Sequence, residues 1–158
     1  MGKRYVSFSL ASGSYCIPVD QVLQILRLEN LLEIPKPPPY VEGVINLRGE
    51  IIPVVNLRER LEIAPQEHAA PKGGDGRKRR VIIARLGTRS YGLDVDEVRE
   101  IVDIDDAGIT SDATMMFGAR ADFIIGIARR DEHLYMLLDL ARVFSAGRDV
   151  PGALTGQG

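Results

Sequence analysis

The chain contains little of the material from which catalytic and metal centres are usually built. Among its 158 residues there are one cysteine, Cys16, two histidines, His68 and His133, and no tryptophan. A single cysteine excludes an intrachain disulfide and a cysteine-based metal cage, and it indicates a reducing compartment. Neither histidine belongs to a zinc or hydrolase motif, so we expect both at the surface. Cys16 is followed by Ile17, which favours a buried structural thiol over a nucleophile. We therefore predict that the protein is not an enzyme.

Long apolar runs and an excess of one charge are also absent. The densest apolar stretch, residues 123–128, is far shorter than the roughly 20 residues of a membrane-spanning helix. No apolar signal region follows Met1. With 20 basic and 22 acidic residues, the bulk charge favours neither nucleic acid nor an anionic membrane as the main partner. Any association with a membrane should therefore be made through another protein.

Short alternating segments separated by turn residues predict a mainly β protein. Residues 6–10 alternate apolar side chains with serine, and residues 15–17 return as a second strand after a Ser-Gly-Ser turn. Residues 19–26 space their apolar side chains by three and four, which predicts a short helix. Residues 28–34 are expected to be extended, up to a proline-rich loop.

The strongest pattern lies in residues 43–55, where two apolar segments flank a turn that contains Gly49. This arrangement predicts a β-hairpin. Asn56 follows, with Glu59 three residues later, and this capping-box pattern predicts a short helix that ends near Leu61.

The first pattern is repeated later in the chain. At a shift of 76 residues, seven of the sixteen positions in 10–25 carry the same residue: Leu10, Ser14, Tyr15, Val19, Asp20, Val22 and Ile25. A shift of 83 aligns Gly43 with Gly126 and Leu57 with Leu140. Self-similarity at a fixed spacing indicates duplication. The change from 76 to 83 implies about seven extra residues in the second copy, most simply in residues 105–120.

The repeat predicts one domain, 1–158, with two approximate subdomains, 4–63 and 79–145. Residues 64–78 are rich in proline, glycine and charge and are expected to form a flexible linker. The glycine-rich tail, 146–158, is expected to be disordered. Exchange of segments between the two units is left open.

Few side chains stand out as functional candidates on chemistry alone. Arg48 is the best single candidate, because its turn needs a glycine but not an arginine, and arginine suits bidentate contacts at interfaces. An ordinary exposed charge is an equally good interpretation. Asp103, Asp105 and Asp106 do not have the spacing of a calcium loop. The basic run 77–80 leaves open an alternative function, a β-barrel pair that binds a small ligand or nucleic acid.

Blocks in both halves of the chain resemble the CheW family of chemotaxis coupling proteins. The blocks are residues 15–22, 39–49 and 51–58, followed by 91–93, 126–128 and 137–140. The resemblance covers about residues 4–145, and the Asn46-to-Gly49 motif in this context is specific. Because no histidine-kinase or receiver domain is attached, we expect a free-standing coupling protein.

The resemblance implies a mainly β fold with two tandem SH3-like five-stranded barrels and a few short helices. It implies an adaptor that couples methyl-accepting chemoreceptors to the histidine kinase CheA in a two-component signalling array. The partners would be the cytoplasmic tip of the receptor and the regulatory domain of the kinase, with self-association in rings as a further possibility. No cofactor, metal or nucleic acid is expected. The expected location is the cytoplasm, at membrane-associated receptor arrays.

The resemblance also implies a set of binding residues. The receptor-binding groove is expected between the barrels and would be lined by Val19, Val22, Gln24, Ile25 and Arg48. The motif turn comprises Asn46, Leu47 and Gly49, and the region of Gly43 is expected to contact the kinase.

Three residues depart from the family pattern. Gln24 replaces a frequent glutamate, Cys16 replaces the usual glycine, and Asn56 replaces a common aspartate. The last change should be neutral, because Asn and Asp cap helices comparably. Only the first copy has the 46–49 motif; the second carries Arg-Arg-Asp-Glu at 129–132.

Overall fold

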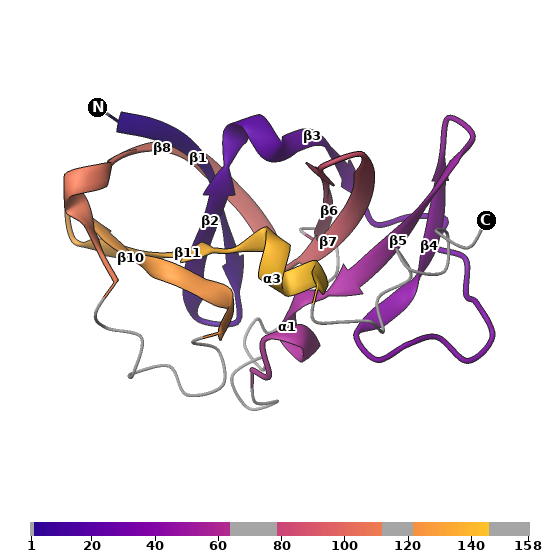
Figure 1. The fold of residues 1–158 in the computed structure, drawn as a ribbon. Helices are drawn as coiled ribbons and strands as arrows, with labels where there is room; N and C mark the ends of the chain where they lie inside the picture. Colours follow the sequence, from indigo (N-terminus) through magenta and orange to yellow (C-terminus); the bar gives the residue numbers. More distant parts are fainter. Residues whose placement is uncertain (1, 64–78, 112–121, 146–158) are drawn as a thin grey trace.

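The computed structural model describes residues 2–63, 79–111 and 122–145. Over these ranges the chain is mainly β, with one six-stranded and one five-stranded sheet and a few short helices. Figure 1 shows the six-stranded sheet at the left, the five-stranded sheet at the right, and helices α1 and α3 between them. The expected linker 64–78 and tail 146–158 lie outside the described residues. No helix in the described ranges is long and apolar enough to cross a membrane.

Each sheet takes strands from both halves of the chain. The spatial order of the first sheet is β8 (Glu97–Asp105), β1 (Gly2–Leu10), β2 (Gly13–Pro18), β11 (His133–Leu138), β10 (Ile124–Arg130) and β9 (Ile109–Thr110). The order of the second is β3 (Val22–Arg27), β6 (Arg80–Leu86), β7 (Arg89–Val95), β5 (Glu50–Asn56) and β4 (Val41–Leu47). The described helices are η1 (Val19–Gln21), α1 (Leu57–Arg60), η3 (Asp106–Gly108) and α3 (Leu140–Ser145).

The pairing registers of the two sheets repeat at the shifts found in the sequence. Val6 pairs with Ile101 in the first sheet, and the equivalent residues, Ile82 and Ile25, pair in the second. The third strand of each copy therefore joins the sheet that the other copy begins: β3 pairs with β6, and β8 pairs with β1. This reciprocal exchange links the two sheets covalently in both directions.

The extra residues of the second copy can be located from the same registers. Leu32 forms a bridge with Val44, and the equivalent pair in the second copy is Thr110 with Ile127. The interval from Ile101 to Thr110 is nine residues, whereas the equivalent interval from Ile25 to Leu32 is seven. The interval from Thr110 to Ile127 is 17 residues, whereas that from Leu32 to Val44 is 12. Two extra residues thus precede Thr110 and five follow it, mostly within 112–121, outside the described residues.

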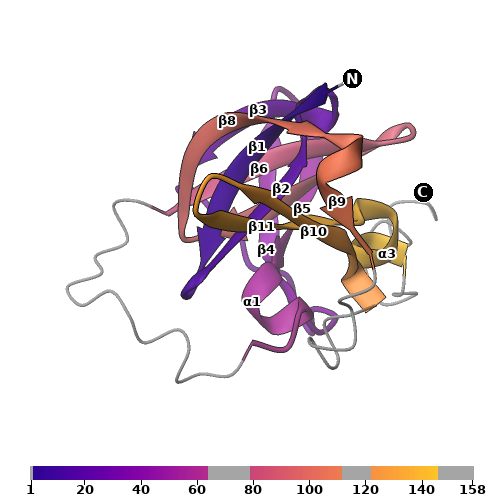
Figure 2. The same ribbon diagram turned by 90° about the vertical axis from the view of Figure 1, so that its left-hand side faces the viewer.

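Three apolar clusters hold this arrangement together. One fills the first sheet around Tyr5, Cys16 and Leu137, and another fills the second sheet around Val54 and Ile83. Figure 2, which faces the first sheet, shows its strands curling over from β8 and β1 to β10 and β9. The largest cluster joins the sheets and both α-helices; its members include Phe8, Tyr15, Leu57, Leu61, Leu93, Leu140 and Phe144. The fold is that of two SH3-like subdomains packed on a shared core.

The prediction of a helix over residues 19–26 is wrong. Only Val19–Gln21 form a single 3-10 turn, and Val22–Arg27 form β3, which pairs with β6. Burial along β3 alternates with a period of two, as expected for a strand. The β-branched side chains in this segment suit a strand, and pairing with a distant part of the chain decided between the two periodicities. Residues 28–34 form no strand, apart from the Leu32 bridge.

The predicted hairpin and helix cap are confirmed. The side-chain oxygen of Asn56 accepts a hydrogen bond from the Glu59 amide at 3.2 Å, and α1 begins at the next residue after Asn56. The equivalent Asp139 caps α3 through the Arg142 amide at 3.3 Å. Such a cap satisfies an amide group that has no partner inside its helix.

Candidate partner-binding surface

The motif turn has a well-defined backbone geometry. Arg48 and Gly49 both have positive φ, 53° and 87°, and Leu47 pairs with Glu50 across them. This is a type I′ geometry, which matches the twist of the two strands. The Gly49 amide donates a hydrogen bond to the side-chain oxygen of Asn46 at 3.0 Å. Glycine relieves strain at the second position, and asparagine fixes the turn, so the motif presents Arg48 from a backbone of defined geometry.

Arg48 projects from the end of the β4–β5 hairpin. Its side chain is exposed, and among the described residues its guanidinium group has no hydrogen bond or ion pair. The equivalent residue in the second hairpin is Asp131, also at positive φ, so the two hairpin ends differ in charge. The arginine is therefore available for an external partner on one of the two hairpins only.

The other predicted groove residues lie on and before the edge strand β3. Val19 belongs to the 3-10 turn, while Val22 and Gln24 are half-buried. Ile25 is 39% exposed, and Leu23, which the sequence analysis did not select, is 53% exposed. In a helix Leu23 and Ile25 would point apart, but in a strand they share the outer face. Reading this segment with a period of two would have identified Leu23.

The structure places Arg48 and β3 on the same sheet but not next to each other. β3 is one edge of the five-stranded sheet, and Arg48 belongs to the hairpin at the other edge. Figure 1 shows β6 and β7 between them. The predicted residues thus divide into an apolar strand and a separate basic turn.

Gly43 is buried at a bulge in β4 and offers no side chain to a partner. A Cβ atom at this position would lie 2.4 Å from the carbonyl oxygen of Leu32. That oxygen accepts a hydrogen bond from the Val44 amide at 2.8 Å. A close approach between two backbone segments therefore explains the glycine. Any role in kinase binding would be exerted through the position of the β4 edge.

Two surface cavities lie away from the predicted groove. One, of about 780 Å³, is lined by residues 12–14, 97–100 and 133–136. The other, of about 280 Å³, is lined by Glu50, Ile51, Pro53 and residues 88–91. Apart from 97–100, Tyr135 and Tyr91, the two linings correspond at the shifts of 76 and 83. The cavities are thus a product of the duplication, and none of the predicted groove residues lines either one.

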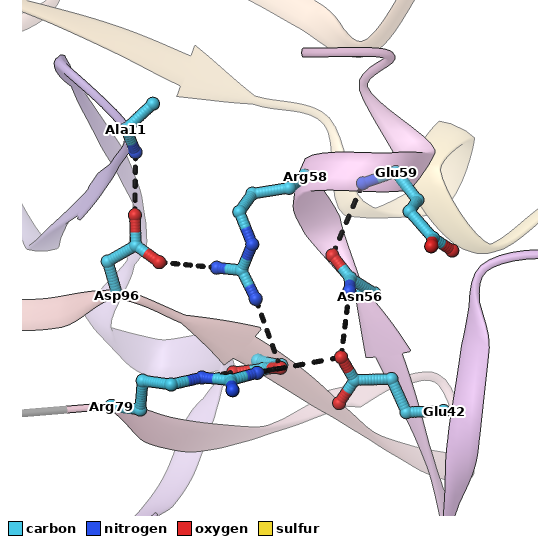
Figure 3. Close-up of polar contacts among 8 residues, drawn as sticks. Ala11, Glu42, Asn56, Arg58, Glu59, Arg79 and Asp96 are labelled. Atoms are coloured by element: carbon cyan, nitrogen blue, oxygen red, sulfur yellow. Dashed lines mark hydrogen bonds and ion pairs between the residues drawn. The ribbon is translucent and has the colours of Figure 1, made fainter. Parts of the chain in front are cut away.

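A buried polar cluster was not anticipated from the sequence. Its centre is Asp94, which is fully buried and accepts hydrogen bonds from Arg58 and Arg79 (Figure 3). Arg58 also binds Asp96, whose second carboxylate oxygen accepts a hydrogen bond from the Ala11 amide at 2.6 Å. These contacts connect α1 and β7 with the β1–β2 turn of the other sheet. Sequence patterns do not reveal them, because the residues meet only through the exchanged topology.

Glu42 forms the outer part of the same cluster. Its Oε2 atom accepts a hydrogen bond from the Asn56 side chain at 2.8 Å and lies 3.6 Å from Arg79, whereas the buried Oε1 has no hydrogen-bond partner among the described residues. Burial raises the pKa of Glu42 to about 8, and the hydrogen bond and charge of Asp94 act in the same direction. Arg79 and Arg58 oppose the shift in this pKa. A carboxyl group in such a site favours its protonated form.

Arg60 joins the two copies where α1 meets α3. Its guanidinium carbon lies 4.6 Å from the centres of both the Tyr40 and the Phe123 rings, and its side chain donates hydrogen bonds to the carbonyl oxygens of Val143 and Arg142. Tyr40 and Phe123 are equivalent at the shift of 83. Arg60 therefore lies between matching positions of the two copies and at the carbonyl end of α3, where a cation is favoured.

The basic run 77–80 is only partly open to an external ligand. Arg79 is engaged by Asp94, and Arg80 begins β6 and donates a hydrogen bond to the Arg79 carbonyl oxygen. Arg77 and Lys78 lie outside the described residues. An internal ion pair accounts for Arg79, which weakens the nucleic-acid alternative.

Cys16 and His133 are the remaining candidates for reactive chemistry among the described residues. Cys16 is buried, and burial raises the pKa of its thiol to about 12, so it is not a nucleophile. His133 is exposed at the start of β11, and His68 lies outside the described residues. In the described part of the chain, no group of His, Cys, Asp or Glu side chains is arranged to hold a metal ion.

Comparisons with known proteins agree over nearly the whole chain. Residues 4–148 match the family model described as CheW-like domain. Chemotaxis protein CheW of Treponema pallidum (strain Nichols) is 28% identical over 141 residues, 89% of this chain and 81% of the relative. Chemotaxis protein CheW of Thermotoga maritima is 29% identical over 139 residues, 87% and 85% of the two chains. The crystal structure of scaffolding protein TtCheW from Thermoanaerobacter tengcongensis matches with a TM-score of 0.79 at 32% identity, covering 92% of this chain and 89% of that one.

Proposed function

The chain belongs to the family of CheW-like domains, and from that premise we propose that it is a scaffold coupling chemoreceptors to the histidine kinase CheA. The observation that carries this proposal is the match of the family over residues 4–148, together with a fold shared over 92% of the chain with a scaffolding protein. Proteins of this family are adaptors without enzymatic activity. The scaffold acts by binding two partners at once.

We assign the receptor to the surface formed by β3 and the motif hairpin. The exposed Leu23 and Ile25 offer an apolar strip, and Arg48 offers a fixed cation with no competing partner in the described part of the chain. An amphipathic helix can lay its apolar face on the β3 strip. Arg48 offers a second, separate contact for an acidic or amide side chain at the other edge of the sheet. The half-buried Val19, Val22 and Gln24 support the strip from beneath, so they act on the position of β3.

We assign the kinase to the β4 edge near Gly43. This edge lies on the opposite side of the sheet from the apolar strip of β3, although it adjoins the hairpin that carries Arg48. A receptor helix on β3 therefore leaves the β4 edge near Gly43 free for the kinase. The central apolar cluster and Arg60 hold the two copies in a fixed relation, which would transmit a change in receptor geometry to the kinase. The scaffold would lie in the cytoplasm at membrane-associated arrays, where many weak links add up. Self-association in rings is a further part of the proposal.

A charge reversal at the motif turn tests the receptor assignment. Arg48→Glu should weaken binding of a receptor cytoplasmic fragment about thirtyfold, because an interface arginine typically accounts for about 2 kcal/mol or more. Receptor-dependent activation of CheA in a reconstituted array should fall accordingly, while binding of the kinase regulatory domain is unchanged. Arg129→Glu is the matched control, an exposed arginine on the equivalent hairpin, and should have little effect. If Arg48→Glu is folded and couples normally, the receptor does not bind at this turn.

A further inference from the structure

The Glu42 side chain lies where several elements converge. Figure 3 shows it pointing from β4 towards Asn56 at the end of β5 and towards Arg79. The charged groups around it are Asp94 from β7, Arg79 ahead of β6, and Arg58 from α1, with Asp96 beyond Arg58. Its Oε2 atom has a donor at 2.8 Å, while the buried Oε1 has none among the described residues.

The charges of this cluster do not balance if every group is ionised. Within the described ranges, three carboxyl groups, Glu42, Asp94 and Asp96, share two guanidinium groups, Arg58 and Arg79. Asp94 and Asp96 have the closer contacts with the guanidinium groups, so Glu42 is the carboxyl group left with the weakest compensation. A buried carboxyl group next to another carboxylate retains its proton, and that proton can be shared with the neighbour.

We propose that Glu42 is a proton-binding site that positions the β4 edge, and that loss of this proton loosens the edge and weakens the kinase contact. The proton lies between the Glu42 and Asp94 carboxyl groups and leaves to solvent as the pH rises. The ionised Glu42 then repels Asp94, which pushes β4 away from β7. The part of this inference that concerns the kinase depends on the proposed function.

β4 is the element best able to respond. It is an edge strand, paired with β5 on one side. On its other side it is held by the two 2.8 Å hydrogen bonds between Leu32 and Val44. Glu42 is the unpaired residue of the bulge between Val41 and Gly43, and it lies two residues from Val44. A displacement of Glu42 therefore acts first on the bridge that supports the proposed kinase edge.

The protein alone tests the proton site. In the wild-type chain, the NMR signal of the Glu42 side-chain carboxyl carbon should titrate above about pH 7. Protection of the Val44 amide from hydrogen exchange, corrected for the intrinsic rate, should fall about tenfold between about pH 6 and pH 9.5. Glu42→Gln, which stays neutral, should keep that protection constant, whereas Glu59→Gln should behave as the wild type. Titration of Glu42 near pH 4.5, or equal loss of protection in Glu42→Gln, overturns the proposal.

Binding of the CheA regulatory domain tests the consequence. Affinity should fall about tenfold over the same pH range for the wild type and for Glu59→Gln, and less than about twofold for Glu42→Gln. Equal pH dependence in wild type and Glu42→Gln overturns the link between the proton and the kinase contact. If the wild type binds the kinase domain at no pH, the proposed function fails instead, and the carboxyl titration and the Val44 protection still decide whether Glu42 positions the edge.

Discussion

Replacing Gly43 with alanine should destabilise the protein far more than its small volume suggests. The added Cβ would be placed 2.4 Å from the carbonyl oxygen of Leu32, closer than carbon and oxygen can approach. The obstructing atom belongs to the backbone, so no side-chain rotation can relieve the contact. The segment around Leu32 must move away from β4, and both hydrogen bonds between Leu32 and Val44 are then stretched or lost.

The size of the destabilisation follows from the steric contact and from the two hydrogen bonds. Overpacking in a well-packed region costs about 1–3 kcal/mol. Each backbone hydrogen bond contributes about 0.5–1.5 kcal/mol net. We therefore expect a loss of about 2–6 kcal/mol in the free energy of unfolding, a large part of the roughly 5–15 kcal/mol that is typical of a whole domain.

Two further glycines provide matched comparisons. At Gly126, the equivalent position in the second copy, a Cβ would lie 2.8 Å from the flexible Ile109 side chain and 3.0 Å from the Thr110 carbonyl oxygen. At Gly108 a Cβ would meet nothing within 4 Å. Urea unfolding, followed by far-ultraviolet circular dichroism because the chain has no tryptophan, should rank the losses as Gly43→Ala, then Gly126→Ala, then Gly108→Ala, with the last within about 0.5 kcal/mol of wild type.

The ranking also separates a structural from a direct role of Gly43 in kinase binding. Gly43→Ala should weaken kinase binding together with hydrogen-exchange protection at Val44. If Gly43→Ala unfolds at the same urea concentration as Gly108→Ala, the close approach to Leu32 does not control the edge, and the reasoning is refuted.

Three other outcomes are expected. The pKa of Glu42 is raised to about 8 in the folded chain from about 4.5 in the unfolded chain, so the folded state binds one more proton between these pH values. The free energy of unfolding should therefore fall with rising pH by about 1.4 kcal/mol per unit relative to Glu42→Gln. Parallel pH profiles of urea unfolding for the two proteins would contradict this. Arg60→Met should cost about 2–4 kcal/mol in thermal or urea unfolding, through lost charged hydrogen bonds and ring contacts; Arg142→Met, which keeps the accepting carbonyl group, is the control and should cost little. Cys16 should react with a thiol reagent only as fast as the chain unfolds, and rapid labelling of the native protein would contradict its burial.

Local signals in the sequence were sufficient for much of the fold. The hairpin at Gly49 and the cap at Asn56 depend on residues within a few positions of each other, so short-range chemistry predicts them. The resemblance of both halves to one family supplied the pair of barrels and the coupling function. The helix predicted after Val19 failed because a strand and a short helix both accommodate its apolar residues, and only pairing with β6 decides between them.

The candidate site was predicted unevenly for the same reason. Arg48 was selected because the turn leaves its identity unconstrained, whereas Leu23 was not selected because its exposure depends on the strand conformation of β3. Glu42, Arg58, Arg79 and Asp94 are separated by up to 52 residues, and nothing in their spacing indicates a cluster.

The sequence by itself therefore determined that this chain is a duplicated, mainly β protein, because periodicity, turn residues and repeats are carried by neighbouring positions. Only the tertiary structure decided that the third and later strands of each copy join the sheet that the other copy begins. Each of β3 and β8 can in principle pair with its own copy, since the equivalent strands have similar patterns, and the choice depends on non-local packing in the shared core. The pairing of β5 with β7 in this arrangement brings Asp94 to Arg58 and Glu42, and so it creates the buried charges on which the regulation of this adaptor is proposed to depend.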